Sequence, residues 1–385
     1  MEKFFATCPR GLEQVLAAEL QVLGARDIKA VDGGVAFAGD FALCYAANLE
    51  SRVASRVLWQ VGHARYGSEQ DIYNAACALS WPRWFDVRRA IRVNVSAIKS
   101  PLKSLDFATL RIKDAVCDAF RAARGKRPDI NTAKPDVRIH AFLTRDEATF
   151  YLDTSGEALF KRGWRVEGGE APLRENLAAG ILKLAGWNPP TPLLDPLCGS
   201  GTFLVEAAMI ALDIAPGINR SFGFEQLENF DAKKWRALCD KAGARRKPAN
   251  PLPIYGSDKS GKILAHAREN LLAAGLTEAV QIKQMDVLDA SPPLAKPGIL
   301  VMNPPYGERL GGQDELAAFY PKLGDTLKQR FAGWTAYLFS ADLRLPKLIG
   351  LAASRRTPLY NGALECRLFE YKLVAGSMRK SMSPE

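Results

Sequence analysis

Short apolar runs alternate with longer segments of helical periodicity from about residue 170 onward, and this alternation restricts the fold more than any other feature. The apolar runs predict strands at 192–198, 253–258, 280–286, 298–304, 335–341 and 366–374. The segments between them predict helices at 173–185, 202–214, 259–274 and 315–330. Strands that alternate with helices form a largely parallel sheet covered on both faces. Residues 215–250 interrupt the alternation, and their Trp, Phe and Arg residues predict a packed insertion.

The first 155 residues predict two smaller α/β units. The unit at 1–65 has strand candidates at 3–8, 35–37 and 56–61 and a helix at 11–23. The unit at 66–155 has helices at 68–79 and 109–124, a strand at 90–98 and a hairpin made by 137–143 and 148–153. We expect 156–190 to connect these units to a domain at 191–374 and to supply a helix that packs on it. Residues 375–385 are expected to form a disordered tail.

The positive charge of the chain is concentrated in its second quarter. The net charge is +10, and residues 50–145 hold 18 Lys and Arg against 9 Asp and Glu. A basic domain beside a more neutral one favours a polyanionic partner, with nucleic acid first. A solvated basic surface without a partner is the alternative that charge alone leaves open.

Several other classes of protein are disfavoured by composition. No apolar run reaches the roughly 18 residues of a membrane span, and the first ten residues lack the apolar core of a signal peptide. We therefore expect a cytoplasmic protein that does not associate with membranes. The seven cysteines and three histidines are scattered, so neither a disulfide framework nor a metal site is expected.

A glycine-rich turn carries the strongest motif of the chain. It is Asp195-Pro196-Leu197-Cys198-Gly199-Ser200-Gly201-Thr202, placed between an apolar strand and a helix. Glycines let the backbone approach a ligand closely, and the helix start offers free N–H groups. The alternative is a dinucleotide site. That alternative is weaker because Leu204 stands where a third glycine is required, and no acidic residue closes a strand about 20 residues later.

The acidic residue and glycine turn resemble the cofactor loop of class I S-adenosylmethionine-dependent methyltransferases. The resemblance implies S-adenosylmethionine as cofactor. It also implies that Asp258, after the second strand, bonds the ribose hydroxyls and that Asp286, after the third, contacts the adenine amine. A plain helix N-cap is the alternative for Asp258. The residues of the turn that the resemblance places around the cofactor are Asp195, Pro196, Cys198, Gly199, Ser200, Gly201 and Thr202.

The tetrapeptide Asn303-Pro304-Pro305-Tyr306 ends another strand and is the candidate catalytic element. Paired prolines stop a strand and fix the backbone around them, at the strand end where α/β sheets bind ligands. The Asn303 side-chain oxygen and the Pro304 carbonyl are suited to accept hydrogen bonds from an exocyclic amine, and Tyr306 is suited to stack on an extruded base. An ordinary strand-ending turn would explain only the prolines.

The tetrapeptide resembles the signature of amino-methyltransferases. That signature is shared by enzymes acting on adenine N6 of DNA or RNA, on guanine N2 of RNA, and on the glutamine amide of release factors. It therefore indicates the reaction type more closely than the substrate. Pyrimidine C5 methyltransferases are disfavoured because no cysteine lies near Asn303, and Cys198 is expected to be a packing residue.

Four stretches resemble bacterial rRNA guanine-N2 methyltransferases: 5–13, 155–165, 171–181 and 303–310. The resemblance covers nearly the whole chain. It implies an α/β, Rossmann-like class I domain with a mostly parallel seven-stranded sheet, preceded by a ferredoxin-like unit and an α+β THUMP domain that binds RNA. It is strongest to the 23S rRNA guanine-N2 family in its single-methyltransferase form. Pro172 and Glu175 would help to close the cofactor site.

The expected partner is 23S rRNA or the assembling large ribosomal subunit, and the oligomeric state is left open. Two other functions stay open as alternatives, namely an adenine N6 methyltransferase acting on RNA or DNA, and an RNA-binding assembly factor without catalysis. An unbroken Asn303–Tyr306 tetrapeptide argues against the second. The candidate RNA contacts in the basic region are Arg83, Arg88, Arg89, Lys99, Lys103, Arg124, Lys126 and Arg127.

Overall fold

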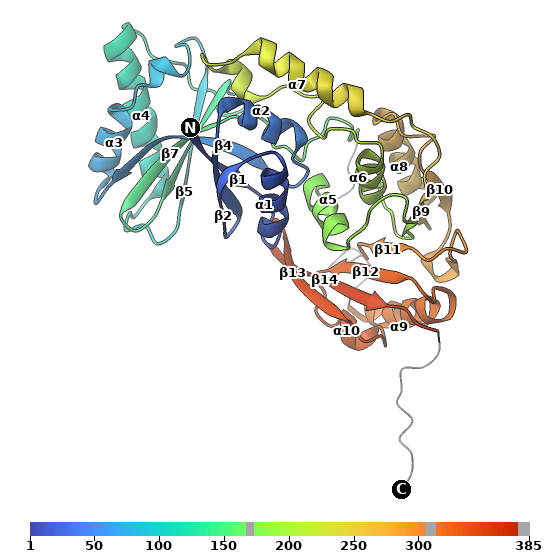
Figure 1. The fold of residues 1–385 in the computed structure, drawn as a ribbon. Coiled ribbons are helices and arrows are strands. Elements are labelled where there is room, and N and C mark those ends of the chain that lie inside the picture. Colours follow the sequence, from blue (N-terminus) through green and yellow to red (C-terminus); the bar gives the residue numbers. More distant parts are fainter. Residues whose placement is uncertain (167–172, 305–312, 376–385) are drawn as a thin grey trace. The chain divides into compact units, whose positions relative to one another are not determined.

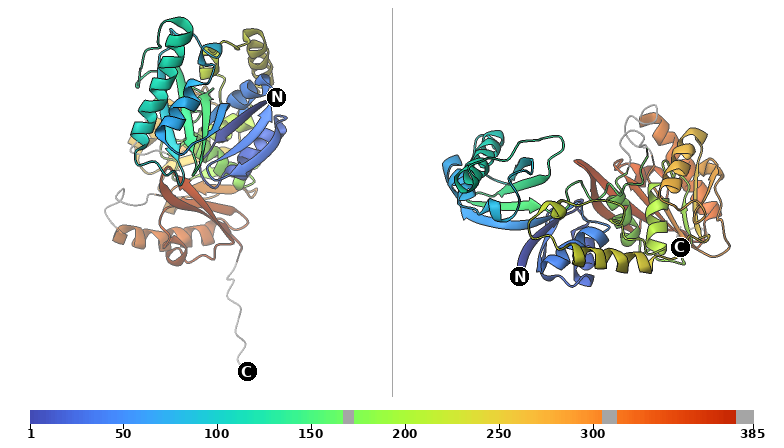
Figure 2. Two further views of the ribbon diagram at one scale, coloured as in Figure 1. Left: turned by 90° about the vertical axis from the view of Figure 1, so that its left-hand side faces the viewer. Right: turned by 90° about the horizontal axis from the view of Figure 1, so that it is seen from above.

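A computed structural model describes residues 1–166, 173–304 and 313–375 (Figures 1 and 2). The chain divides into two compact units, each built on a seven-stranded sheet. Unit 1 comprises Met1–Cys8, Leu16–Arg162 and Ala215–Ala244, and unit 2 comprises Pro9–Val15, Gly163–Ile214 and the chain from Arg245 onward. The residues expected to form a disordered tail lie, except for Ala375, outside the described residues.

Unit 1 contains a mixed sheet of strand order β2-β3-β1-β4-β7-β6-β5. Neighbouring strands are antiparallel except for the parallel pair β5 and β6. The hairpin expected near 137–153 is present as β6 and β7, paired in antiparallel register. The strands are β1 (Glu2–Thr7), β2 (Arg26–Val31), β3 (Gly34–Gly39), β4 (Arg56–Arg65), β5 (Ile91–Ala97), β6 (Val137–Leu143) and β7 (Glu147–Asp153).

Helices cover the apolar face of this sheet. In β6, for example, alternate residues from Val137 to Leu143 are buried, as the period of two of a half-buried strand requires. Ser68 and Ser104 cap the helices α3 and α4 by accepting a backbone N–H three residues later. The helices of this unit, with one 3₁₀ turn, are α1 (Glu13–Val22), α2 (Phe41–Glu50), α3 (Glu69–Cys77), η1 (Trp81–Arg83) and α4 (Leu105–Arg124).

Most of the insertion predicted at 215–250 packs within unit 1, which includes its residues 215–244. Its 3₁₀ turn η2 (Gly223–Gln226) and helix α7 (Ala232–Arg245) surround an aromatic cluster. The ring of Tyr45, on α2, lies 4.6 Å from that of Phe224, which lies 5.1 Å from that of Trp235. The Tyr45 hydroxyl accepts a hydrogen bond of 2.9 Å from the Asp231 N–H. A segment inserted in the second half of the sequence therefore completes the core of the first unit.

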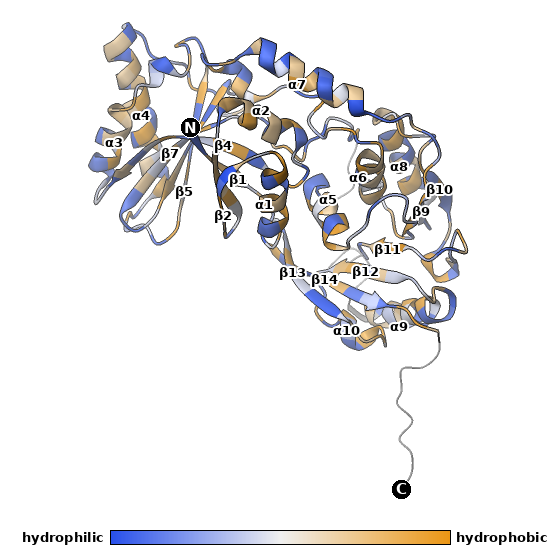
Figure 3. Cartoon of the chain, in the orientation of Figure 1, coloured by the Kyte–Doolittle hydropathy of each residue, from blue (hydrophilic) through white to orange (hydrophobic). Residues whose placement is uncertain are grey.

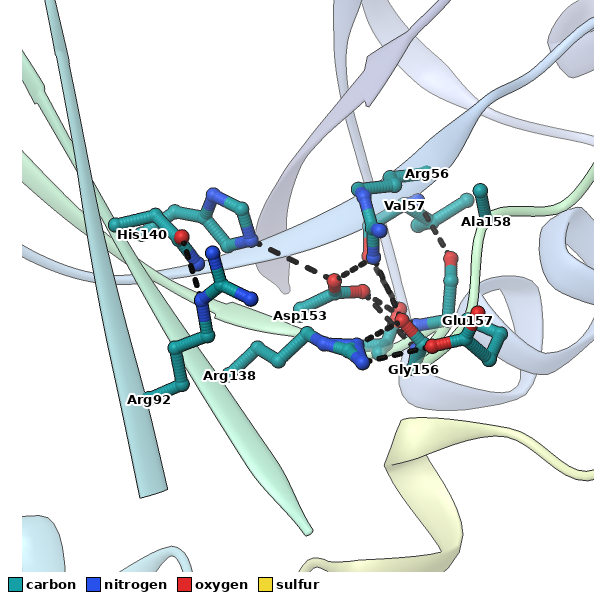
Figure 4. Close-up of polar contacts among 12 residues, drawn as sticks. Arg56, Val57, Arg92, Arg138, His140, Asp153, Gly156, Glu157 and Ala158 are labelled. Atoms are coloured by element: carbon teal, nitrogen blue, oxygen red, sulfur yellow. Dashed lines mark hydrogen bonds and ion pairs between the residues drawn. The ribbon is translucent and has the colours of Figure 1, made fainter. Parts of the chain in front are cut away.

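A buried carboxylate joins the end of β7 to its neighbours (Figure 4). Asp153 lies between the Arg56 guanidinium and His140, whose Nε2 is 3.5 Å from Oδ2 of Asp153. Burial raises its pKa, but the nearby His140 and the charge of Arg56 outweigh this and hold the pKa below its usual range. The N–H groups of Ser155 and Gly156 donate to Oδ1 of Asp153, so the same carboxylate shapes the turn that follows β7.

Unit 2 contains the mostly parallel seven-stranded sheet that was expected, with strand order β10-β9-β8-β11-β12-β14-β13. The five strands from β10 to β12 are parallel, and β14 is antiparallel to both of its neighbours. The strands are β8 (Leu193–Asp195), β9 (Ile254–Asp258), β10 (Gln281–Gln284), β11 (Ile299–Met302), β12 (Thr335–Ser340), β13 (Arg355–Asn361) and β14 (Leu364–Lys372).

Helices lie on both faces of the second sheet (Figure 1). On one face, α9 packs against the strands through a core that includes Leu323, Leu300 and Phe369. On the other, Leu204 of α6 reaches the backbone of Gly256 in β9. None of the helices in the described ranges is long and apolar enough to cross a membrane. The helices and the 3₁₀ turn are α5 (Glu175–Leu184), α6 (Thr202–Ala211), α8 (Gly261–Ala273), η3 (Val287–Asp289), α9 (Gln313–Arg330) and α10 (Leu345–Leu348).

Several elements were not anticipated from the sequence, among them α2, β2, β13, α7 and α10. Helix α2 buries most of its residues, so it has no polar face to mark a helical period. Strands β2 and β13 lie at the edges of their sheets, and their exposed charged residues hide the alternation of a half-buried strand. Pro358, within β13, is tolerated because an edge strand has one unpaired side.

The buried ion pair of unit 1 should make its stability depend on acid pH. An Asp with a lowered folded-state pKa stabilises the fold above its ordinary pKa of 3.8, and this contribution is lost as the pH falls through the folded value. Asp153→Asn should lower the free energy of unfolding at pH 7 by about 3 kcal/mol, because the Arg56 charge loses its partner. Denaturation in urea between pH 2 and 7 should show a shallower acid slope for the variant. An unchanged slope would contradict the assignment.

Two helical glycines should respond in opposite directions to replacement by alanine. A Cβ at Gly324, in α9, would overlap the Ile349 carbonyl oxygen, whereas a Cβ at Gly243, in α7, would meet nothing within 4 Å. Gly324→Ala should therefore destabilise the protein by more than about 2 kcal/mol, and Gly243→Ala should stabilise it by up to about 1 kcal/mol. Thermal unfolding of both variants beside the parent tests the pair. Destabilisation by Gly243→Ala would contradict the helix packing described here.

Candidate cofactor and methyl-transfer site

Three neighbouring parallel strands of unit 2 bring the candidate residues to one edge of the sheet. Strand β8 lies between β9 and β11, with Asp195 opposite Gly256 and Leu194 opposite Leu300. Because the strands are parallel, their carboxyl ends meet at the same edge. From β8 the strand order runs through β9 to β10 on one side and through β11 to β12 on the other. Open α/β sheets bind ligands at such a reversal.

The glycine turn joins β8 to α6 in a conformation that requires its glycines. Gly199 and Gly201 have φ angles of +54° and +82°, in the region that other L residues rarely adopt. The Cys198 N–H donates to the Ser257 carbonyl at 2.9 Å, which ties the turn to β9. A Cβ at Gly201 would lie 3.3 Å from Cβ of Ala267, whereas one at Gly199 would meet nothing within 4 Å. The turn is thus packed against α8 at Gly201 and has open space beside it at Gly199.

Asp258 is held at the end of β9 by contacts with the glycine turn. Its Oδ2 accepts a hydrogen bond of 3.2 Å from the Gly199 N–H, and its Oδ1 accepts one of 2.9 Å from the Ser260 N–H. The N-cap of α8 is Ser260, whose hydroxyl accepts from the Ile263 N–H. The alternative of a plain N-cap at Asp258 is therefore wrong, and the carboxylate lies half-buried beside the open glycine.

Asp286 follows β10 and caps the 3₁₀ turn η3. Its Oδ1 accepts a hydrogen bond of 2.9 Å from the Leu288 N–H, and its side chain is half-buried. The hydrogen bond of the Asp286 carboxylate is therefore a local one, to a residue two positions later in the chain. A second carboxylate oxygen is available to a ligand in addition to this capping bond.

Asp195 and Cys198 are buried beneath the turn. Burial, with the nearby Asp258 charge, raises the pKa of the Asp195 carboxyl well above its usual range. Burial also raises the pKa of the Cys198 thiol well above its usual value, so the thiolate form is suppressed. Pro196 is buried between them. These residues form the floor of the turn, and a buried thiol that stays protonated is a poor nucleophile.

Asn303 directly follows β11 and presents an unusual buried acceptor. Its Oδ1 is inaccessible to solvent and has no hydrogen-bond partner among the described residues. An unsatisfied buried acceptor costs about 1–3 kcal/mol, so it calls for an explanation, and a ligand donor is one. The next residue, Pro304, is buried. Pro305 and Tyr306, the other half of the predicted catalytic tetrapeptide, lie outside the described residues.

Arg165 brings together several predicted cofactor residues and was itself not predicted. Its Nε donates to Oε1 of Glu175 at 2.7 Å, and its two Nη atoms reach Oγ of Ser200 at 3.2 Å and Oγ1 of Thr202 at 2.9 Å. Glu175, at the start of α5, is almost fully buried. The arginine therefore clamps the glycine turn to the segment before α5. Pro172, predicted in that segment, lies outside the described residues.

Asn270 is a second residue that sequence reasoning missed. It is fully buried in α8, its Nδ2 donates to the Ser200 carbonyl at 3.0 Å, and its Oδ1 accepts from the Val166 N–H at 3.0 Å. It thus links the glycine turn to the segment that follows Arg165. A polar residue on the buried face of a predicted helix was the only available signal for it.

The basic residues expected to contact RNA fall into two groups within unit 1. Lys99 and Lys103 are exposed in the loop between β5 and the amino end of α4. The 20 residues of α4 span about 30 Å, so a single short stretch of RNA would not contact both ends. The second group lies at the other end of α4 and in the segment leading to β5: Arg83, Arg88, Arg89, Arg124, Lys126 and Arg127. All of these residues are exposed except Arg89, which is half-buried.

Two curated relatives extend over almost all of this chain. A candidate RNA methyltransferase of Synechocystis sp. is 39% identical over 371 residues, which are 96% of this chain and 96% of the relative. The ribosomal RNA large subunit methyltransferase K/L of Shewanella frigidimarina is also 39% identical, over 99% of this chain but 54% of its own length. The chain therefore spans about half the length of the second relative.

A solved structure supports the cofactor. The crystal structure of a candidate methyltransferase in complex with S-adenosylhomocysteine is 31% identical, with a TM-score of 0.87 over 98% of this chain and 99% of that one. S-adenosylhomocysteine is what remains of S-adenosylmethionine after methyl transfer. The open side of Gly199 and the half-buried Asp258 carboxylate beside it suit a nucleoside ligand of this kind.

Removal of the Arg165 clamp should weaken cofactor binding. Arg165→Ala frees the Ser200 and Thr202 hydroxyls and leaves the buried Glu175 without its charge partner, so we expect about tenfold weaker binding of S-adenosylhomocysteine. The exposed Arg268, on α8, provides the matched control Arg268→Ala, which should change affinity less than twofold. Calorimetric titration of both variants measures this. Equal affinities in the two variants would rule out the clamp.

Three family models cover the chain in succession. The RlmL ferredoxin-like domain matches residues 3–58, the THUMP domain matches 66–153, and the RMKL-like methyltransferase domain matches 162–370, more than half of the chain. The strand order of unit 2 and its glycine turn agree with the last of these. The chain belongs to the family of RMKL-like, S-adenosylmethionine-dependent methyltransferases that carry a THUMP domain.

Proposed function

We propose that this protein methylates an exocyclic amine of a base in RNA, and that the base is a guanine of 23S rRNA modified at N2. The observation that carries this proposal is the buried Oδ1 of Asn303 at the carboxyl end of β11, which has no hydrogen-bond partner among the described residues and lies next to the strand that leads into the glycine turn. An acceptor in that position suits an N–H donor of the substrate. A carbon nucleophile has no such donor, and a hydroxyl has one where an amine has two.

The residues of the site would act mainly by binding and orientation. When bound, S-adenosylmethionine supplies a methyl group on a positively charged sulfur, so no strong base is required. Gly199, Gly201 and Asp258 would hold the cofactor, with Asp286 on its adenine side. Asn303 Oδ1 and the Pro304 carbonyl would accept the two amine N–H groups and turn the nitrogen lone pair away from the ring. As the nitrogen–methyl bond forms and the sulfur–methyl bond breaks, the methylated nitrogen becomes acidic and its extra proton passes to water, so positioning supplies most of the catalysis.

The base must leave its helix to reach this site. Enzymes that modify bases extrude the target nucleotide and stack it on an aromatic or apolar side chain. Tyr306, which follows the two prolines in the sequence, is the residue proposed for stacking. The cost of extrusion is lowest for a base in a loop or an incompletely folded RNA, which favours 23S rRNA during assembly as the substrate.

Support for an rRNA substrate comes from three directions. The relative that matches 99% of this chain is named a ribosomal RNA large subunit methyltransferase. The THUMP match at 66–153 overlaps the basic region 50–145, which contains 18 basic and 9 acidic residues. The sequence resemblance to guanine-N2 enzymes includes the whole run 303–310. Phosphate contacts by these basic residues would position the RNA without reading its sequence.

Mass spectrometry of rRNA nucleosides tests the substrate directly. A strain that lacks the gene should lose one equivalent of N2-methylguanosine from 23S rRNA, and the purified protein with S-adenosylmethionine should restore it on that RNA. Loss of N6-methyladenosine instead would identify an adenine enzyme. An unchanged set of methylated nucleosides, together with no transfer in vitro, would reject the proposal in favour of a non-catalytic role.

Asn303→Ala should separate catalysis from cofactor binding. Removal of one preorganised hydrogen-bonding group costs a factor of about 100 or more in rate, so kcat should fall by at least that factor. The affinity for S-adenosylhomocysteine should stay within about twofold of the parent. The exposed Asn188 provides the matched control Asn188→Ala, which should change neither quantity. A parallel fall in kcat and in cofactor affinity would place Asn303 in the cofactor pocket instead.

A further inference from the structure

Helix α7 and the residues directly after it form a second concentration of positive charge. The 16 residues from 232 to 247 contain seven Lys and Arg and a single acidic residue, Asp240. They lie outside the basic region 50–145 and outside the THUMP match. Four of the basic residues belong to the part of α7 assigned to unit 1, and all four are exposed: Lys233, Lys234, Arg236 and Lys241.

The apolar side of α7 is fully used in holding the helix to unit 1. Trp235, Leu238 and Ala242 follow one another at helical spacing and pack against Leu49 and Ala215. Trp235 also contacts the aromatic cluster, with its ring 5.4 Å from that of Phe222. Figure 3 shows both hydrophilic and hydrophobic colours along the helix, as expected for one buried side. The helix is therefore fixed in place, and its basic side faces solvent.

Among the described residues, two of the seven basic residues have an ion-pair partner, Lys234 with Asp231 and Arg245 with Asp213. Lys234 lies 3.4 Å from Asp231, the residue whose carboxylate accepts the first backbone N–H groups of the helix. Within the described ranges, Lys233, Arg236 and Lys241 make no ion pair. Lys233 and Arg236 are three residues apart, so they are neighbours on the helix surface and repel each other. An external anion would relieve this repulsion.

We propose that α7 binds the phosphate backbone of the RNA substrate, as a contact surface separate from the THUMP domain. This inference rests on the proposed function, because it identifies the polyanion with that RNA. A membrane surface does not fit, since amphipathic helices bind lipid through an exposed apolar side and that of α7 is already buried. Lysine and arginine on a rigid helix suit phosphates, and the contact would add affinity without sequence preference.

A set of three substitutions in α7 tests the proposal. The variant Lys233→Ala, Arg236→Ala, Lys241→Ala keeps residues with good helix propensity and removes three charges. Binding of a 23S rRNA transcript should be measured from 50 to 300 mM salt. Log affinity decreases as log salt increases, and each lost phosphate contact reduces the magnitude of this slope by about 0.7–0.9. The slope of the alanine variant should therefore be smaller in magnitude than that of the parent by about 2. At the lowest salt concentration the affinity should fall by about tenfold or more.

A charge-preserving variant is the matched control. Lys233→Arg, Arg236→Lys, Lys241→Arg should bind the transcript within about twofold of the parent and with the same salt slope. Asp240→Asn, on the same helix, should strengthen binding because it removes the acidic residue. Both the alanine and the charge-preserving variants should keep the parent affinity for S-adenosylhomocysteine, which reports on unit 2.

The outcomes separate this inference from the proposed function. An alanine variant that binds RNA with the parent slope, while the parent protein methylates rRNA, overturns the role of α7 and leaves the function standing. Equal losses in the alanine and charge-preserving variants also overturn it, because the effect would then not depend on charge. If the parent protein neither binds nor methylates the transcript, the proposed function itself fails.

Discussion

The parallel pairing of β8 with β9 is the constraint on which the site depends. It places the glycine turn beside the end of β9, where the Ser257 carbonyl accepts from Cys198 and the Asp258 carboxylate accepts from Gly199. A turn with two left-handed glycines would otherwise sample many conformations. Hydrogen bonds that the turn donates to the neighbouring strand select one of them and leave the Gly199 side open. The binding surface is thus a consequence of strand register more than of any single side chain.

Much of this arrangement could be predicted because it follows the period of the backbone. Alternating apolar segments predicted the parallel sheet, and parallel strands necessarily gather Asp195, Asp258 and Asn303 at one edge. Arg165 and Asn270 could not be found in this way. Their role arises from hydrogen bonds to Ser200 and Thr202 across 35 to 70 positions of sequence, and a polar side chain carries no periodic signal of such a partner.

The elements that escaped prediction share a physical cause. Sequence patterns reveal a helix or strand when one of its sides is exposed to solvent and the other is buried. Helix α2 is buried on nearly all sides, and the edge strands β2 and β13 are largely exposed to solvent. The insertion at 215–250 was recognised as packed from its aromatic residues, yet nothing in its composition indicated that its partner would be Tyr45, on a helix about 180 residues earlier.

The division of both units into separate stretches of chain has a consequence for biosynthesis. Unit 1 needs η2 and most of α7, which are translated only after β8 and α6 of unit 2. A nascent chain that has emerged as far as Arg162 therefore still exposes the apolar surface around Tyr45 and Leu49. Completion of the first core must wait until residue 244 has been translated, whereas the core of unit 2 needs strands as late as β14. A single proteolytic cut between β7 and α5 cannot release the N-terminal unit intact.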